Sequence, residues 1–229
     1  ILYNLCGVCN ARLKNLDDAL ENYQKAIQIN PNFTDALFNK STLLESMGKI
    51  DNAIETYQKV LEISPENFQA FYNLGNIYKK KRKLKAALEN YQKAVKINPE
   101  FADAYNNIGN ILKSSGELNA ALENYQKAIK INSSYAPALT NLGSIELNTG
   151  NKQEGLSLLI KATESDTQLA PAWGNLANGY AQFGKTQEAE IACRKSIELN
   201  PNLFNSHFLL GTILLGQKKL QQAENSLRK

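Results

Sequence analysis

The chain has 229 residues, of which 43% are hydrophobic and 21% are charged, and its formal net charge is +4. No apolar run is long enough to span a membrane and the charge is too mild to indicate a polyanionic partner, so we expect neither membrane insertion nor nucleic-acid binding. The three cysteines form no disulfide framework, which favours a reducing compartment and predicts a cytoplasmic protein.

A repeat of fixed length organises the chain. The hexapeptide ENYQKA begins at Glu21, Glu89 and Glu123, and a near-copy, ETYQKV, begins at Glu55, so that successive copies are 34 residues apart. This period predicts a single array over residues 1–229 with seven repeats, the last of them truncated. Their ranges are 1–33, 34–67, 68–101, 102–135, 136–169, 170–203 and 204–229.

Each repeat predicts two short amphipathic helices. With Thr34 counted as position 1 of the second repeat, apolar or small residues recur at positions 4, 7, 8 and 11, the stripe of a first helix with one buried face. We expect the second helix to bury positions 17, 20, 21, 24, 27, 28 and 30 and to end before a proline at position 32. Glycine at position 15 predicts the break between the two helices in four repeats, at Gly48, Gly116, Gly150 and Gly184.

The fifth repeat is the least regular. Glu146 replaces a large apolar residue at position 11, Gly155 replaces alanine at position 20, and Leu159 replaces the hexapeptide tyrosine at position 24. These departures predict local looseness or a bend within residues 136–169.

The recurring motifs identify a family. The third repeat contains FYNLGNIY and the sixth contains WGNLANGY, each followed by the spaced alanine and proline of the second helix. In this pattern the chain resembles the tetratricopeptide repeat (TPR) proteins. The resemblance implies an all-α fold, a right-handed α-solenoid of helix-turn-helix repeats whose first helices line a concave groove. A coiled coil would need heptads without these regular breaks.

Asparagine recurs on the face of the first helix that we expect to line the groove. It is a mediocre helix former, so its recurrence needs a reason. A side-chain amide offers a donor and an acceptor, which match the backbone of an extended peptide, but it could equally bond neighbouring repeats together. Both interpretations stay open for position 6, whereas a ligand role is favoured at position 9. The asparagines are Asn39, Asn73, Asn107, Asn141 and Asn175 at position 6 and Asn76, Asn110 and Asn178 at position 9.

The position-6 row has a parallel in one branch of the family. It is similar to the asparagine ladder in the TPR superhelix of the O-linked N-acetylglucosamine transferases, which implies a grip on peptide backbones. The other predicted groove residues are Tyr72 and Asn106 at position 5 and Lys79 and Lys113 at position 12. TPR domains that clamp the C-terminal carboxylate of chaperones use lysine and arginine at positions 2, 5 and 6. The chain has neither residue there, which argues against such a receptor.

Nothing in the sequence indicates catalysis. The lone His207 falls on a core position, and the Cys6-x-x-Cys9 pair lies on a predicted helix without a second pair, which favours packing over a metal site. We therefore expect no enzyme activity, no cofactor and no metal.

The sequence predicts a protein-interaction scaffold that binds an extended peptide segment of a partner protein in the groove. The alternative is the substrate-recognition arm of a larger enzyme, such as a glycosyltransferase, because the first and last repeats lack the polar caps of a complete solenoid. Uncapped terminal helices also leave end-to-end self-association open.

Overall fold

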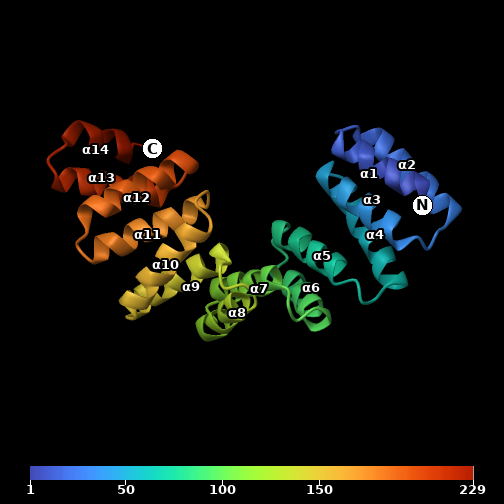
Figure 1. The fold of residues 1–229 in the computed structure, drawn as a ribbon, viewed down its shortest axis with the longest axis horizontal. Coiled ribbons are helices and arrows are strands. Elements are labelled where there is room, and N and C mark those ends of the chain that lie inside the picture. Colours follow the sequence, from blue (N-terminus) through green and yellow to red (C-terminus); the bar gives the residue numbers. More distant parts are fainter. Residues whose placement is uncertain (229) are drawn as a thin grey trace. The chain divides into compact units, whose positions relative to one another are not determined.

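The computed structural model describes residues 1–228, so Lys229, the end of the seventh predicted repeat, lies outside the described residues. Residues 1–228 form fourteen helices and no strand, which confirms the predicted all-α fold (Figure 1). Each predicted repeat contributes two consecutive helices. They are α1 (Leu2–Arg12), α2 (Leu16–Ile29), α3 (Thr34–Ser46), α4 (Ile50–Ile63), α5 (Phe68–Lys80), α6 (Leu84–Ile97), α7 (Ala102–Ser114), α8 (Leu118–Ile131), α9 (Ala136–Thr149), α10 (Lys152–Ser165), α11 (Ala170–Gln182), α12 (Thr186–Leu199), α13 (Phe204–Gly216) and α14 (Leu220–Leu227).

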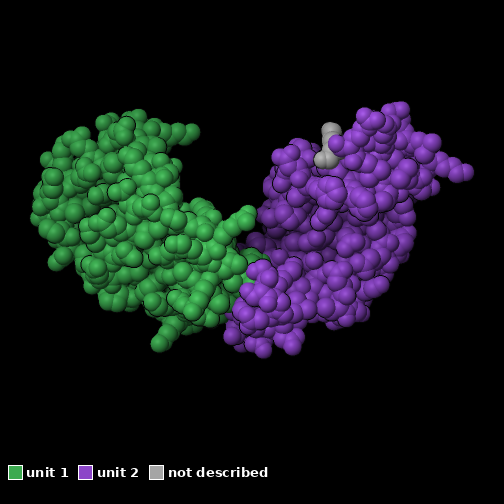
Figure 2. Space-filling model, turned by 180° about the vertical axis from the view of Figure 1, so that it is seen from behind, with its two compact units in different colours: residues 1–111 green, residues 112–229 purple. Residues whose placement is uncertain are grey.

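The chain divides into two compact units, residues 1–111 (unit 1) and residues 112–229 (unit 2), with the boundary inside α7 (Figure 2). Within each unit, a first helix packs against the second helix of its own repeat, and that second helix also contacts the next first helix. The single solenoid over the whole chain and its right-handed superhelix stay predictions.

The turn inside every repeat depends on one residue with left-handed backbone conformation at position 15. Glycine holds this position in four repeats, as predicted, with φ between 71° and 112°. In the other three repeats the residue carries a side chain, which adopts this conformation at a cost. These residues are Lys14, Arg82 and Lys218, with φ of 64°, 58° and 63°.

The turn between repeats uses a feature that the sequence analysis did not identify. An asparagine or aspartate at position 31 accepts, through Oδ1, a hydrogen bond from the backbone N–H of position 33. This Asx turn closes the chain without proline, which explains why Ser133 and Thr167 can stand at position 32. The accepting residues are Asn30, Asn98, Asn132, Asp166 and Asn200, at 2.9–3.1 Å.

The core of a repeat is set by the contact between positions 8 and 24. A Cβ atom added to Gly7 would lie 2.5 Å from the ring of Tyr23, and one added to Gly75 would lie 2.6 Å from the ring of Tyr91. In these two repeats glycine allows the tyrosine ring to approach the first helix this closely, whereas Ser41 holds position 8 in the second repeat, where Tyr57 is also buried. The hexapeptide tyrosine is a buried packing residue, and burial raises the pKa of Tyr125 to about 12.

The first helix buries more positions than the predicted 4, 7, 8 and 11. Positions 3 and 10 are also buried, because each first helix packs against the preceding repeat as well as against its own partner helix. Position 3 holds a small residue at this contact in six repeats: Ala36, Ala70, Ala104, Ala138, Ala172 and Ser206.

The second helix buries less than predicted at both ends, because position 17, also expected to be buried, is 40% exposed at Leu84 and 67% exposed at Leu220. Position 30 was expected to be buried, but Ile29 is 73% exposed and Ile63 is 37% exposed, so the prediction is wrong there. Position 30 is the last residue of the second helix, and it lies beyond the first helices that cover positions 20, 24 and 27.

The predicted looseness of the fifth repeat is also wrong for its helix pair. A Cβ atom on Gly155 would lie 2.5 Å from the backbone nitrogen of Leu147, so α9 and α10 approach more closely than any side chain permits. Leu159 is fully buried, and a Cβ atom on Gly143 would lie 2.9 Å from it. Leucine replaces tyrosine here because the two backbones leave room for a smaller side chain.

Two glycine substitutions in unit 1 separate packing from backbone conformation. Gly75→Ala should lower the free energy of unfolding by about 1–3 kcal/mol, because its methyl group overlaps the Tyr91 ring. Gly48→Ala meets no atom within 4 Å and should cost about 1 kcal/mol through its positive φ alone. Urea denaturation followed by circular dichroism measures both losses, and a larger loss for Gly48→Ala would contradict the glycine–tyrosine contact.

Cys193 provides a reporter for unit 2. It is fully buried, and burial raises the pKa of its thiol to about 12. Because the thiolate is the reactive form, Cys193 should react with a disulfide reagent only when unit 2 unfolds. The variant Cys6→Ser, Cys9→Ser leaves it as the single thiol. Labelling of the folded variant at the rate of an unfolded peptide would show the burial to be wrong.

Candidate functional site

The predicted asparagine row begins in unit 1 with a bond between repeats. Asn39 Nδ2 donates a hydrogen bond to Asn4 Oδ1 at 3.1 Å. Asn4 occupies position 5 of the first repeat and is buried. A position-6 amide therefore reaches back to the preceding first helix.

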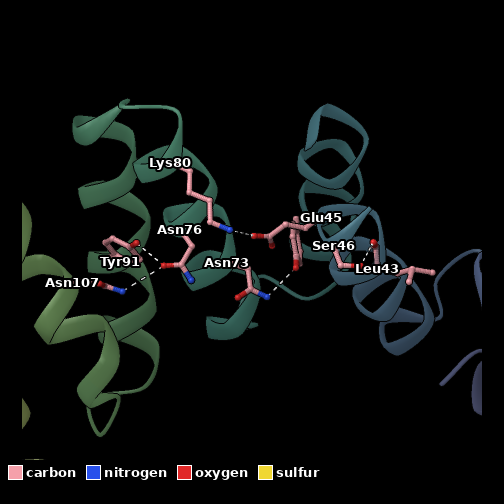
Figure 3. Close-up of polar contacts among 9 residues, drawn as sticks. Leu43, Glu45, Ser46, Asn73, Asn76, Lys80, Tyr91 and Asn107 are labelled. Atoms are coloured by element: carbon pink, nitrogen blue, oxygen red, sulfur yellow. Dashed lines mark hydrogen bonds and ion pairs between the residues drawn. The ribbon is translucent and has the colours of Figure 1, made fainter. Parts of the chain in front are cut away.

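The next asparagines hold the hydroxyl groups of the hexapeptide tyrosines (Figure 3). Asn73 Nδ2 donates to the Tyr57 hydroxyl at 2.9 Å, and the Tyr91 hydroxyl donates to Asn76 Oδ1 at 2.7 Å. A buried tyrosine needs a partner for its hydroxyl group, and burial raises the pKa of both tyrosines, which keeps them neutral. Here positions 6 and 9 serve the core.

Asn107 is the centre of the largest network in unit 1. Its Nδ2 donates to the Tyr72 hydroxyl at 3.3 Å and to Asn76 Oδ1 at 3.5 Å, while its Oδ1 accepts from Lys79 Nζ at 3.0 Å. Burial, helped by the neighbouring charge of Lys80, lowers the pKa of Lys79. The structure thus brings together four predicted site residues, and their polar groups are largely directed at one another.

The remaining predicted residues differ in exposure. Asn106 is buried, Asn110 and Asn141 are half-buried, and Lys113 is exposed at the end of α7. Asn106, Asn110 and Asn141 each have a partner within the chain.

The two asparagines of the sixth repeat have different surroundings. Asn175 and Asn178 line a cavity of about 530 Å³ between α11 and α13, within unit 2. In residues 1–228, neither of their side-chain amides makes a hydrogen bond with another residue. These amides are available to a ligand.

The side-chain amides of Asn175 and Asn178 have no hydrogen-bond partner within residues 1–228 because position 24 lacks tyrosine in the fifth and sixth repeats. In unit 1, Asn73 bonds the position-24 tyrosine of the preceding repeat, and Asn76 bonds that of its own repeat. The corresponding residues for Asn175 and Asn178 are Leu159 and Cys193, which are buried and offer no hydroxyl group.

The walls of the cavity come from groove positions of two successive repeats. Gly174, at position 5, has no side chain to fill the space, and Phe204 and Phe208 stack at 6.1 Å between ring centroids on the opposite side. Both rings are more than half exposed, at 66% and 54%. The other lining residues are Pro171, Asn202, Leu203, Asn205, Ser206 and Leu209, so no charged side chain lines the cavity.

Gly174 is also required by packing. A Cβ atom on it would lie 2.9 Å from Ser206 Oγ, which shares a 2.8 Å hydrogen bond with Ser196 Oγ. The buried serine pair joins α12 to α13 and fixes the position of the cavity wall.

The other residues considered for chemistry serve the fold or the surface. The buried His207 has its Nε2 2.8 Å from the carbonyl oxygen of Pro201. Trp173 Nε1 donates a hydrogen bond to the carbonyl oxygen of Thr167 at 3.0 Å. Cys6 is half-buried, but Cys9 is exposed, so packing does not explain the second cysteine. No group of three metal-ligating side chains occurs in residues 1–228, and none of their helices has the length and apolar character to cross a bilayer.

Comparison with protein families decides the identity of the repeats. Models described as TPR repeat or tetratricopeptide repeat match residues 1–33, 22–55, 43–82, 75–114, 109–150, 170–203 and 192–225. The chain belongs to the tetratricopeptide repeat family. A search of curated protein sequences returned no match.

Solved TPR structures resemble the chain along most of its length. YrrB, described as a TPR protein with an unusual peptide-binding site, is 28% identical with a TM-score of 0.62, over 86% of this chain and 98% of its own. MamA is 27% identical with a TM-score of 0.62, over 72% and 96%. PilF of Pseudomonas aeruginosa shares the fold, with 16% identity and a TM-score of 0.79, over 90% and 93%. These matches support a TPR array, and they do not extend to the asparagine ladder or to a glycosyltransferase arm.

The sequence analysis missed the aromatic side of the TPR cavity. Phe208 and Gly174 occupy position 5, which was expected to face the groove, but at that position only Tyr72 and Asn106 were predicted to bind. A readable signal was present, because position 24 changes from tyrosine to leucine and cysteine in the fifth and sixth repeats.

The two asparagine environments predict different effects on stability. Asn107→Ala should lower the free energy of unfolding by about 1–3 kcal/mol, because Tyr72, Asn76 and Lys79 lose a buried partner. Asn178→Ala should change it by less than about 0.5 kcal/mol, as expected for an exposed residue without partners. Urea unfolding of both variants tests this, and equal losses would contradict the assigned environments.

Proposed function

We propose that this TPR protein is a protein-interaction scaffold that binds an extended peptide segment of a partner protein at the α11–α13 cavity. The observation that carries the proposal is the pair of unpartnered amides, Asn175 and Asn178, at a cavity built from groove positions. Its volume of about 530 Å³ is within the range of ligand sites.

The lining indicates how such a segment would be held. The amides of Asn175 and Asn178 offer donors and acceptors to a peptide backbone, whose own groups lose water on binding and need partners. The exposed rings of Phe204 and Phe208 offer apolar surface to one side chain of the ligand. Since the lining carries no charge, the cavity favours an uncharged side chain at that place.

The asparagines of unit 1 are not expected to bind the peptide. Asn73, Asn76 and Asn107 are held by tyrosine and lysine side chains, so a peptide that used them would first have to break those bonds. The first helices of unit 1 therefore support the scaffold, and the peptide contacts concentrate in unit 2. YrrB, with its peptide-binding site, is a precedent among proteins of similar sequence and length.

A selected peptide tests the site directly. Peptides enriched from a random displayed library on the full chain would be titrated calorimetrically against Asn175→Ala, Asn178→Ala and Phe208→Ala. Each variant should weaken binding by about tenfold, the effect of about 1.4 kcal/mol for a lost hydrogen bond or aromatic contact.

The matched control is Asn124→Ala in α8, also in unit 2. Its side chain bonds the carbonyl oxygen of Ala120 in its own helix, and it lies on the second-helix face. Binding should be unchanged in this variant. Full affinity in all three cavity variants, or an equal loss in Asn124→Ala, would place the peptide elsewhere.

A further inference from the structure

A second hollow lies on the other side of α11. It has a volume of about 320 Å³ and is bordered by residues of α10, α11 and α12, all within unit 2. We call it the α10–α12 groove. Trp173, Leu176 and Tyr180 of α11 form its floor, and Ile160 and Ile191 are among the residues of its walls.

The wall contains an aliphatic residue where other repeats carry charge. Ile191 occupies position 22, which is the glutamate of the hexapeptide in four other repeats. In two of these repeats, the glutamate pairs with the lysine four residues later, as Glu21–Lys25 and Glu55–Lys59. Ile191 is 66% exposed, and the corresponding Lys195 pairs with Glu198 instead. The change places apolar surface on a face that is otherwise polar.

The floor is aromatic and fixed. The indole N–H of Trp173 donates to the Thr167 carbonyl oxygen at 3.0 Å, which anchors the ring near the C-terminal end of α10. Tyr180 lies towards the other end of α11, where Lys185 Nζ is 5.8 Å from the centroid of its ring. A cation of the chain itself thus already occupies the tyrosine end of the groove.

The two carboxylates of the groove differ in their local charge. Glu164 is in the last turn of α10, which contains no basic residue, so its charge adds to the negative end of the helix dipole. Glu188 is in the first turn of α12, where the positive end of the dipole and Lys185 at the N-cap offset it. Neither makes an ion pair within residues 1–228. Glu164 thus places an uncompensated carboxylate of the last turn of α10 in the lining that it shares with Trp173.

We propose that the α10–α12 groove binds an arginine or lysine side chain of a partner protein. The aliphatic stem lies against Ile191 and Trp173, as long cationic side chains do on apolar surfaces, and the charged group lies between the indole face and the Glu164 carboxylate. A neighbouring aliphatic residue of the partner contacts Ile160. The groove thus offers a second protein contact, on the face opposite the peptide cavity and independent of it.

Trp173 is the only tryptophan of the chain, so its fluorescence reports on this groove. The probes are the capped peptide acetyl-Gly-Leu-Arg-Gly-amide and its counterpart with glutamine in place of arginine. The arginine peptide should shift the Trp173 emission with a dissociation constant of about 1 mM, and the glutamine peptide should bind about fivefold more weakly.

Four substitutions locate the contact. Glu164→Gln should remove the preference for arginine, whereas Glu188→Gln, at the other end of the same groove, should change it by less than about twofold. Ile191→Gln should weaken both peptides alike, because it removes the shared apolar contact. Glu123→Gln, at position 22 of α8, is the matched control with the same charge change and should have no effect.

The outcomes separate clearly. No response up to about 10 mM peptide, equal affinity for arginine and glutamine, or a loss with Glu188→Gln as large as with Glu164→Gln would each overturn the proposal.

Discussion

The contact between a tyrosine ring and a glycine sets the packing of the helix pair in the first and third repeats. At Gly75 and Tyr91 the ring takes the place of the missing side chain, so the two helices of a repeat approach at a distance fixed by one aromatic ring. The contact also carries the tyrosine hydroxyl to the edge of the first helix, where burial forces it to find a partner. Glycine at position 8, tyrosine at position 24 and asparagine at positions 6 and 9 are therefore parts of one packing solution.

This dependence changes the meaning of the asparagine row. A row of identical amides at 34-residue intervals is expected from a ligand with a regular backbone, but it is equally expected from a repeat whose tyrosine hydroxyl needs the same partner each time. In unit 1 the second explanation accounts for Asn73 and Asn76, which bond Tyr57 and Tyr91. In the fifth and sixth repeats Leu159 and Cys193 replace these tyrosines, so Asn175 and Asn178 have no tyrosine hydroxyl group to bond at these positions.

The sequence predicted the helices and their breaks because the period of 34 residues averages the signal over seven copies. It could not show that positions 3 and 10 are buried, since that depends on how the preceding repeat packs, nor that Gly155 brings two backbones into contact. The cavity at Gly174 was hidden for the same reason. An absent side chain leaves space only where the residues around it, here Leu209 and Phe208, do not fill it. The burial of positions 3 and 10 and the cavity at Gly174 depend on contacts between two repeats, whereas the sequence pattern describes the residues of one repeat.

Departures from a repeat are informative in two distinct ways. Some departures are absorbed by packing, as at position 24, where Leu159 and Cys193 are as fully buried as the tyrosines, whereas others leave a group without a partner or exposed. Gly155 replaces the usual alanine, and the substitution is explained by packing, because the Gly155 backbone lies directly against the Leu147 backbone. Cys193 replaces the hexapeptide tyrosine, so the amide of Asn178 has no hydroxyl group to bond at that position. Ile191 replaces the hexapeptide glutamate and exposes an apolar side chain. Both lie on α12 and both affect α11, whose two sides line the α11–α13 cavity and the α10–α12 groove. The second helix of the sixth repeat, where Ile191 and Cys193 replace hexapeptide residues, is thus the part of the chain that leaves groups exposed for a partner, whereas the regular hexapeptides stabilise the packing of the helix pairs.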